Sequence, residues 1–316
     1  MNTSAVEKIA DAVLYEGYIL YPYRPSSVKN WQRFNFGVLY PRRYCDCQAG
    51  GSESWEMRTE CLVAGPGSAS IETKVRFLQM SSRLHPGQVW QEGQERDVST
   101  SAKSLEALAA ETHRQAIVFP GEADAEHISR HIEGELQLAA SQLDENLYWL
   151  SLRTVNLTKP DDLSDADRDD MLLHSMVSVH SILEVTGGEF VSLLDPPEAL
   201  KAAATACRNS GTWPVLAGEE GQRNMILSAP IILYDYPQIA PESPGDLFDG
   251  TEIDEILALR ILTMTDAEKF EVRNCDDRAR RILDRTEMLP TEHFQKLHGA
   301  LRGLRASTTA PIGDAG

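Results

Sequence analysis

An acidic stretch between Ser228 and Leu257 holds the side chains best suited to chemistry in this sequence. It reads SAPIILYDYPQIAPESPGDLFDGTEIDEIL and contains seven carboxylates, four prolines and two tyrosines, with no Lys, Arg or His. Asp235 follows the apolar run Ile231–Leu233, which we expect to be a strand that breaks into a loop at Tyr234. Functional sites are commonly built at the ends of buried strands, so Asp235 is the first candidate.

Three interpretations of these acids remain open. Asp235, Asp249 and Glu252 could bind Mg²⁺ or Ca²⁺, which prefer carboxylate oxygens, and so form an enzyme site with a divalent metal. The stretch could instead dock a partner protein. In the third interpretation Asp246 and Glu255 join Asp249 and Glu252 in capping the next helix, because acids favour a helix N-terminus through its dipole.

Thiols and imidazoles offer a weaker case for a metal. Cys45 and Cys47 form a C-x-C pair and Cys61 is a possible third ligand, but a structural zinc site takes four. We therefore expect a loop that carries two thiols. His174 and His180 lie six residues apart, which is too far to share a metal ion in a strand, so we expect surface or partly buried histidines.

Cys207 is expected at the end of an Ala-rich helix that starts after Asp195 and stops before Gly211. The dipole at a helix C-terminus raises the pKa of a thiol and does not activate it. We therefore favour a buried small side chain at Cys207, with Arg208 complementing the dipole, over a nucleophile. The sequences typical of dinucleotide sites, P-loops and hydrolase nucleophile elbows do not occur.

Composition narrows the class of protein. The chain has 316 residues, 42% of them apolar and 25% charged, which is typical of a core-forming globular protein. Its formal net charge of −18 argues against nucleic-acid and anionic-membrane surfaces and favours basic partners. No secretory signal or bilayer-spanning apolar run is visible, and five cysteines fit a reducing compartment, so we expect a cytoplasmic protein.

Hydrophobic periodicity predicts an α+β protein. An antiparallel β-sandwich-like N-terminal region precedes a mixed β/α C-terminal region that ends in short helices. We place a β-rich domain at 1–158, a mixed domain at 171–305, with which it could share one core, and a disordered tail at 306–316. The clearest elements are a helix over 6–16, a strand over 70–83, a hairpin over 132–158, the helix over 195–211 and a strand over 224–237.

Several long motifs resemble a known family. They are LYEGYILYPYRPSSVKNWQRFNFGVLYP, TECLV, VRFLQ, GEFVSLLDPP, ACRNSGTWPVLAG and the acidic stretch extended to TDAEK, and the likeness runs from about residue 10 to about residue 302. The family comprises uncharacterised bacterial proteins encoded in operons of the actinobacterial-type NiFe hydrogenase, an oxygen-tolerant, high-affinity uptake enzyme.

The resemblance implies an accessory role in maturation or assembly of that hydrogenase, by binding a hydrogenase subunit or a maturation protein. It implies no catalytic residue and no cofactor; a divalent metal belongs to the enzyme alternative, and a structural subunit of the complex is a further alternative. The matching motifs contain these side chains suited to binding: Tyr21, Tyr23, Arg24, Lys29, Cys61, Asp195, Cys207, Arg208, Asn209, Trp213, Tyr234, Asp235, Glu242, Asp249, Glu252 and Glu255.

Overall fold

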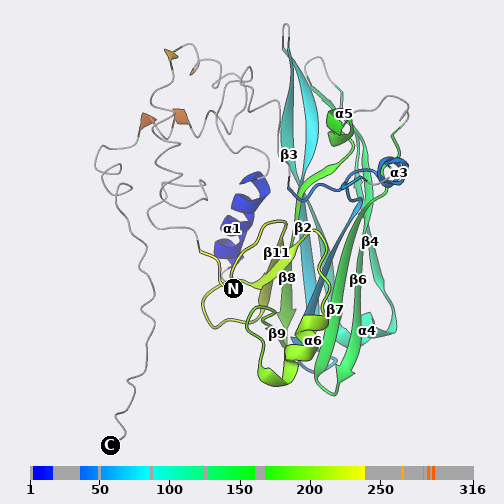
Figure 1. The fold of residues 1–316 in the computed structure, drawn as a ribbon, viewed down its shortest axis with the longest axis vertical. Coiled ribbons are helices and arrows are strands. Elements are labelled where there is room, and N and C mark those ends of the chain that lie inside the picture. Colours follow the sequence, from blue (N-terminus) through cyan, green and yellow to red (C-terminus); the bar gives the residue numbers. More distant parts are fainter. Residues whose placement is uncertain are drawn as a thin grey trace, which may run out of the picture.

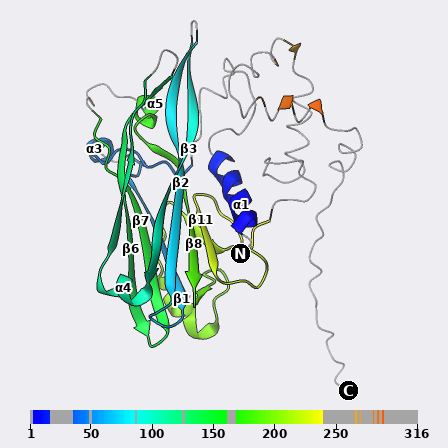
Figure 2. The same cartoon turned by 180° about the vertical axis from the view of Figure 1, so that it is seen from behind.

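The main body of the protein is two antiparallel β-sheets that face each other (Figures 1 and 2). The computed structural model describes residues 3–16, 36–48, 51–85, 88–123, 127–160 and 168–238, and positions 265, 266, 269, 280, 283, 284, 287 and 288. The strands are β1 (Glu56–Ala64), β2 (Ser70–His85), β3 (Gln88–Ser104), β4 (His113–Phe119), β5 (His127–Ser129), β6 (Ile132–Asp144), β7 (Leu147–Asn156), β8 (Met176–Thr186), β9 (Glu189–Val191), β10 (Trp213–Leu216) and β11 (Met225–Ala229).

The first sheet, here the β1 sheet, has the order β4-β6-β7-β1-β9. The second, the β2 sheet, has the order β10-β11-β8-β2-β3, with β5 paired to β2. Helices are short and flank the sheets: α1 (Thr3–Glu16), α3 (Arg42–Cys47), α4 (Leu105–Ala110), α5 (Arg168–Leu172), the 3-10 helix η1 (Glu198–Leu200) and α6 (Lys201–Ala206). The predicted α+β class and the sandwich-like arrangement are confirmed.

Period-two patterns place the core between the sheets. In β2, Ile71, Val75 and Phe77 are buried, whereas Glu72 is exposed and Lys74 is partly exposed. Successive side chains of a strand point to opposite faces, so the apolar set faces inward. The hairpin predicted over 132–158 is present as β6 and β7, which pair from Gly134↔Asn156 to Asp144↔Leu147.

Strands from both predicted domains contribute to both sheets. β8 pairs with β2 and β9 pairs with β1, although each pair straddles the predicted boundary at 159–170. The main core cluster likewise contains Phe77 and Leu138 together with Leu183 and Phe190. The two sequence regions therefore share one hydrophobic core in the described residues.

Helix α1 lies on the outer face of the β2 sheet (Figure 1). Its apolar side Val6, Ile9 and Ala10 packs against Ile182 and Leu227. The apolar face predicted for residues 6–16 is therefore the face that packs.

Two ion pairs link α1 to β2 in addition to the apolar contacts. Glu7 Oε1 lies 3.3 Å from Lys74 Nζ, and Asp11 Oδ1 lies 2.6 Å from Arg76 Nη2. Four helical residues rise about 6 Å and two strand residues rise about 6.6 Å. The acids and the bases therefore repeat at nearly the same interval.

Three local predictions were wrong. The helix expected over 195–211 is only η1 and α6, which end at Ala206. The strand expected to run to residue 237 ends at Ala229, because Pro230 has no backbone N–H for a ladder hydrogen bond. Cys45 and Cys47 lie in helix α3 and not in a loop.

Candidate functional site

Asp235 connects the turn after β9 and its own segment to the end of β10 through hydrogen bonds. Its Oδ1 accepts a hydrogen bond from the Leu216 N–H at 2.8 Å, and its Oδ2 accepts one from the Ser192 hydroxyl at 2.6 Å. Ser192 Oγ in turn accepts the N–H groups of Leu194 (3.1 Å) and Asp195 (2.9 Å). We call this set of four hydrogen bonds the Asp235 clamp. It holds the 192–195 turn and the 234–236 segment against one strand.

The chain turns sharply beside the clamp. Tyr236 has a φ of +56°, a conformation that non-glycine residues rarely adopt, and its N–H donates to the Leu216 carbonyl at 2.7 Å. The Tyr236 ring packs against the main core, whereas the Tyr234 side chain is 83% exposed. The clamp therefore anchors one tyrosine in the protein and presents the other to solvent.

Residues 207–210 follow the edge of β1. Asn209 Oδ1 accepts the Glu60 N–H at 2.7 Å, and Asn209 Nδ2 donates to the Glu60 carbonyl at 3.3 Å. The Glu60 carboxylate accepts the Arg208 N–H at 2.7 Å, and Ser210 forms a bridge with Arg58. These contacts take up backbone groups that would otherwise extend the helix, which is why α6 ends before Cys207.

A buried chain of hydroxyls positions the start of β10. Thr212 Oγ1 donates to the Ala229 carbonyl at 3.1 Å and lies 2.7 Å from Ser228 Oγ, which lies 2.7 Å from Thr59 Oγ1. Each hydroxyl has one proton, so Ser228 must donate to Thr212 and Thr59 must donate to Ser228. This chain links β1 to β11 and fixes the residue before Trp213.

Large apolar side chains are exposed on β10 and on the segments bonded to it. Trp213 is 44% exposed at the first residue of β10, and Leu194 is 56% exposed in the 192–195 turn. Ile232 and Tyr234 are exposed between β11 and the clamp. We call Leu194, Trp213, Ile232 and Tyr234 the β10 rim. β10 is an edge strand of its sheet, so the rim lies at a border of the sandwich.

The thiols are poorly suited to nucleophilic chemistry. Burial, followed by the Glu60 carboxylate, raises the pKa of Cys207 to about 11. Burial also raises the pKa of Cys61, with smaller contributions from Cys207 and Glu60. Burial and the nearby Glu53 raise the pKa of Cys45 to about 11. These three thiols stay protonated at neutral pH, whereas the thiolate is the nucleophile and the metal ligand.

His180 is fully buried, contrary to the partly exposed site expected. Its Nδ1 lies 3.0 Å from the Ser178 carbonyl, and its Nε2 has no hydrogen-bond partner within the described ranges. Burial lowers its pKa to about 4, the Ser178 contact opposes this, and Arg76 adds to it. The imidazole is therefore neutral in the folded protein at pH 7.

The predicted binding residues divide into four groups. Trp213, Tyr234, Asp195 and Arg208 are exposed, while Asp235 and Asn209 have structural hydrogen bonds. The thiol of Cys61 is buried and that of Cys207 is partly buried. The other predicted residues lie outside the described residues: Tyr21, Tyr23, Arg24, Lys29, Glu242, Asp249, Glu252 and Glu255.

The metal alternative has one described ligand, Asp235, whose two oxygens already accept hydrogen bonds. Asp249 and Glu252 lie beyond residue 238. Across the described ranges, no three His, Cys, Asp or Glu side chains are grouped closely enough to hold a metal ion.

Sequence reasoning missed Ser192 and Glu60, which complete the hydrogen-bonded arrangements at Asp235 and Asn209. Neither residue has a local signal, because their partners lie 43 and 149 positions away along the chain. To predict the role of Glu60, one would have had to know beforehand that residues 208–210 lie along β1.

Comparisons with known proteins add no relative: neither a known protein family nor a curated protein matches the chain. In the part of the chain that the structure describes, no helix is both long and apolar enough to cross a membrane.

Proposed function

We propose that this protein is a cytoplasmic accessory factor that binds another protein during maturation or assembly of a NiFe hydrogenase. One observation supports the binding role: the Asp235 clamp presents Tyr234 to solvent from a fixed backbone, while the partly buried Tyr236 packs against the core. The motif resemblance supports the hydrogenase as the partner system, because three of the matching motifs, GEFVSLLDPP, ACRNSGTWPVLAG and SAPIILYDYP, contain the residues of the rim and the clamp.

The β10 rim has the composition of a binding surface. Trp and Tyr are enriched among the residues that contribute most to protein–protein affinity. Trp213 and Tyr234 are exposed, and so are the apolar side chains of Leu194 and Ile232. Hydrogen bonds fix the backbone at Leu216, so little conformational entropy is lost on binding. A rigid strand with exposed aromatic side chains serves recognition better than acid–base chemistry.

Charge favours a partner with a basic face. The chain has 48 acidic and 30 basic residues, which gives the net charge of −18. Such a field accelerates encounter with positively charged surfaces and repels acidic ones. A hydrogenase subunit precursor or a maturation protein with a basic docking surface fits this requirement.

Affinity purification of the tagged protein from cells that express the hydrogenase tests the proposal. We expect a hydrogenase subunit, its precursor or a maturation protein in the eluate, in less than stoichiometric amount. Deletion of the gene should abolish hydrogen uptake and leave general growth unchanged. Normal hydrogen uptake in the deletion strain would overturn the proposal.

Two other outcomes of the purification would support the alternatives. Recovery of mature hydrogenase with one copy of this chain per complex would make it a structural subunit. Recovery of the chain alone with a bound divalent metal would favour an enzyme with an acidic site near Asp235 and Asp249. Asp235→Asn would then be expected to lower metal content as well as activity.

A further inference from the structure

Helix α1 covers a buried histidine on the outer face of the β2 sheet. His180 has no exposed surface and lies on the same face of β8 as Ile182, because side chains two positions apart in a strand point the same way. Ile182 packs against the apolar side of α1. Near the other end of the helix, Leu14 belongs to the cluster that contains Val177 of β8. Contacts between α1 and β8 therefore bracket His180.

A cation lies directly opposite this imidazole. The register of β2 and β8 pairs His180 with Arg76, which is only 9% exposed. Arg76 Nη2 lies 2.6 Å from Asp11 Oδ1 of α1 and 3.5 Å from Glu95 Oε2 of β3. The carboxylate that α1 brings to this part of the sheet is therefore paired with the guanidinium of Arg76.

The imidazole has no place for a second proton while α1 is docked. A neutral histidine has one N–H, and Nδ1 of His180 donates it to the Ser178 carbonyl at 3.0 Å. Protonation would place a second N–H on Nε2, which is buried and has no hydrogen-bond partner in the described part of the chain. A charged imidazolium there would be desolvated, would lack an acceptor and would face Arg76, and each of these is unfavourable.

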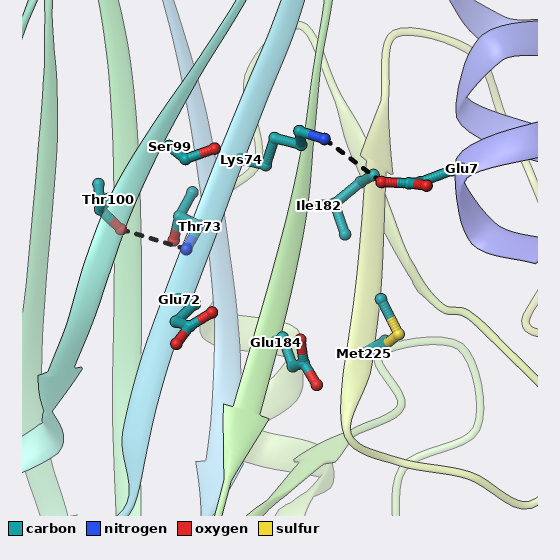
Figure 3. Close-up of a pocket in the computed structure, with 9 residues that line it drawn as sticks. All are labelled: Glu7, Glu72, Thr73, Lys74, Ser99, Thr100, Ile182, Glu184 and Met225. Atoms are coloured by element: carbon teal, nitrogen blue, oxygen red, sulfur yellow. Dashed lines mark hydrogen bonds and ion pairs between the residues drawn. The ribbon is translucent and has the colours of Figure 1, made fainter. Parts of the chain in front are cut away.

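The other charged side chains on this face belong to α1, β2 and β8. Lys74 of β2 pairs with Glu7 of α1 at 3.3 Å (Figure 3), and Glu184 of β8 lies opposite Glu72 of β2. On β11 and residues 36–39, which flank the other edge of β8, no residue is titratable. A pocket of about 210 Å³ adjoins the four charged side chains, so the packing of α1 on the sheet is incomplete at this end of the helix.

We propose that α1 is a pH-sensitive switch, which protonation of His180 releases from the outer face of the β2 sheet. While the helix is docked, it keeps water away from Nε2. When the helix moves away, Nε2 can hydrogen-bond to water and the imidazole can take up a proton. Release uncovers the apolar side chains of Ile182 and Leu227, which are not part of the β10 rim. The switch does not depend on the proposed hydrogenase role.

The sign and size of the effect follow from the two forms of the histidine. Burial lowers the pKa of His180 to about 4 in the docked form, with the Ser178 contact opposing this and Arg76 adding to it. An exposed histidine has a pKa of about 6.5. Between these two values the released form binds a proton that the docked form does not. Docking should therefore be strongest above about pH 6.5 and weaken about tenfold for each pH unit below it.

Hydrogen–deuterium exchange of the full chain, measured by mass spectrometry, tests the switch. Dividing each exchange rate by that of an unfolded peptide at the same pH gives an opening constant for each segment. The α1 amides should open more often than the β6–β7 amides, because release is local. The α1 opening constant should rise about tenfold from about pH 6.5 to about pH 5.5 in the wild type and stay constant in His180→Gln. His113→Gln, which alters a histidine of β4 in the other sheet, is the matched control and should keep the wild-type rise.

An α1 opening constant that does not depend on pH would overturn the proposal. So would one equal to that of β6–β7, which would mean global unfolding, or an equal rise in His180→Gln, which would assign the effect to the ion pairs of α1. If His180→Gln does not fold, Ile9→Ala provides a second test, because it removes a buried contact of α1 and leaves the imidazole in place. It should raise the α1 opening constant about tenfold or more, and an unchanged constant would also overturn the proposal.

Discussion

Replacing Asp235 with alanine should destabilise the protein by about 3 kcal/mol. The change removes the acceptor for the Leu216 N–H and for the Ser192 hydroxyl. Hydrogen bonds to charged groups contribute about 1.5–3 kcal/mol each, and a buried N–H left unpaired costs about 1–3 kcal/mol. Leu216 is buried but Asp235 is partly exposed, so water can replace part of the lost hydrogen bonding. The total cost therefore stays at about 3 kcal/mol, near the lower end of the summed contributions.

Asp235→Asn distinguishes the contribution of the Leu216 hydrogen bond from that of the Ser192 hydrogen bond. The asparagine carbonyl oxygen can still accept the Leu216 N–H, so that bond is retained. Ser192 Oγ already accepts two N–H groups, from Leu194 and Asp195, and has no lone pair left for an amide donor. We therefore expect Asp235→Asn to cost about 1–1.5 kcal/mol, roughly half the alanine effect.

Urea unfolding at 25 °C, followed by circular dichroism, measures these free energies of unfolding. Asp195→Ala is the matched control, because Asp195 is an exposed carboxylate in the same turn, and surface changes usually stay within about 0.5 kcal/mol. A double-mutant cycle of Asp235→Ala with Ser192→Ala should show a coupling of about 1 kcal/mol. The reasoning is refuted if Asp235→Ala costs no more than Asp195→Ala, or if asparagine costs as much as alanine.

Three further predictions concern His180, Asn209 and the cysteines. Burial lowers the pKa of His180 from 6.5 to about 4, so in this range the unfolded state binds a proton that the folded state does not. Stability should therefore fall as the pH drops from about 6.5 towards 4. The urea midpoint of His180→Gln should depend less on pH over that range than the wild-type midpoint does, and an equal dependence would contradict the argument. Asn209→Ala should cost about 2 kcal/mol, because it removes two hydrogen bonds to the Glu60 backbone; an unchanged urea midpoint would be inconsistent with this. Maleimide labelling followed by mass spectrometry should modify exposed Cys47 in the native protein and buried Cys61 only after unfolding, whereas labelling of both at one rate would show that the burial is wrong.

Local patterns sufficed for the elements whose neighbours are close in sequence. The alternation around Ile71 and Val75 predicts β2, and the turn near residue 145 predicts the β6–β7 hairpin. The apolar spacing of Val6 and Ile9 predicts the packed side of α1. In each case the burial pattern of one segment fixes its conformation, so no knowledge of distant contacts is needed.

Distant contacts explain what local patterns missed. The Ala-rich helix stops at Ala206 because Glu60, almost 150 positions earlier, binds residues 208 and 209. His180 is buried because it lies on the same face of β8 as Ile182, the face that α1 covers. The opposition of Glu72 and Glu184 depends on the register of two strands that are far apart in the sequence.

The candidate site was anticipated in its residues but not in their roles. Asp235 was expected as a ligand, an acid–base group or a docking carboxylate, and the structure shows it as a clamp that accepts two hydrogen bonds. Trp213 and Tyr234 were expected to contact a partner, and they are exposed. A carboxylate in a sequence does not reveal its donors, since Ser192 and Leu216 reach Asp235 only through the fold.

The most direct test of the central claim is a paired affinity purification from hydrogenase-expressing cells. The bait carries Trp213→Ala with Tyr234→Ala in one strain and Val118→Ala in the other, because Val118 is an exposed apolar residue of β4, at the opposite edge of the β1 sheet from β9. Loss of a hydrogenase subunit or maturation protein with the rim variant, and retention with Val118→Ala, is the predicted result. Equal recovery of that partner with both baits would contradict the claim that the protein acts by binding through the rim.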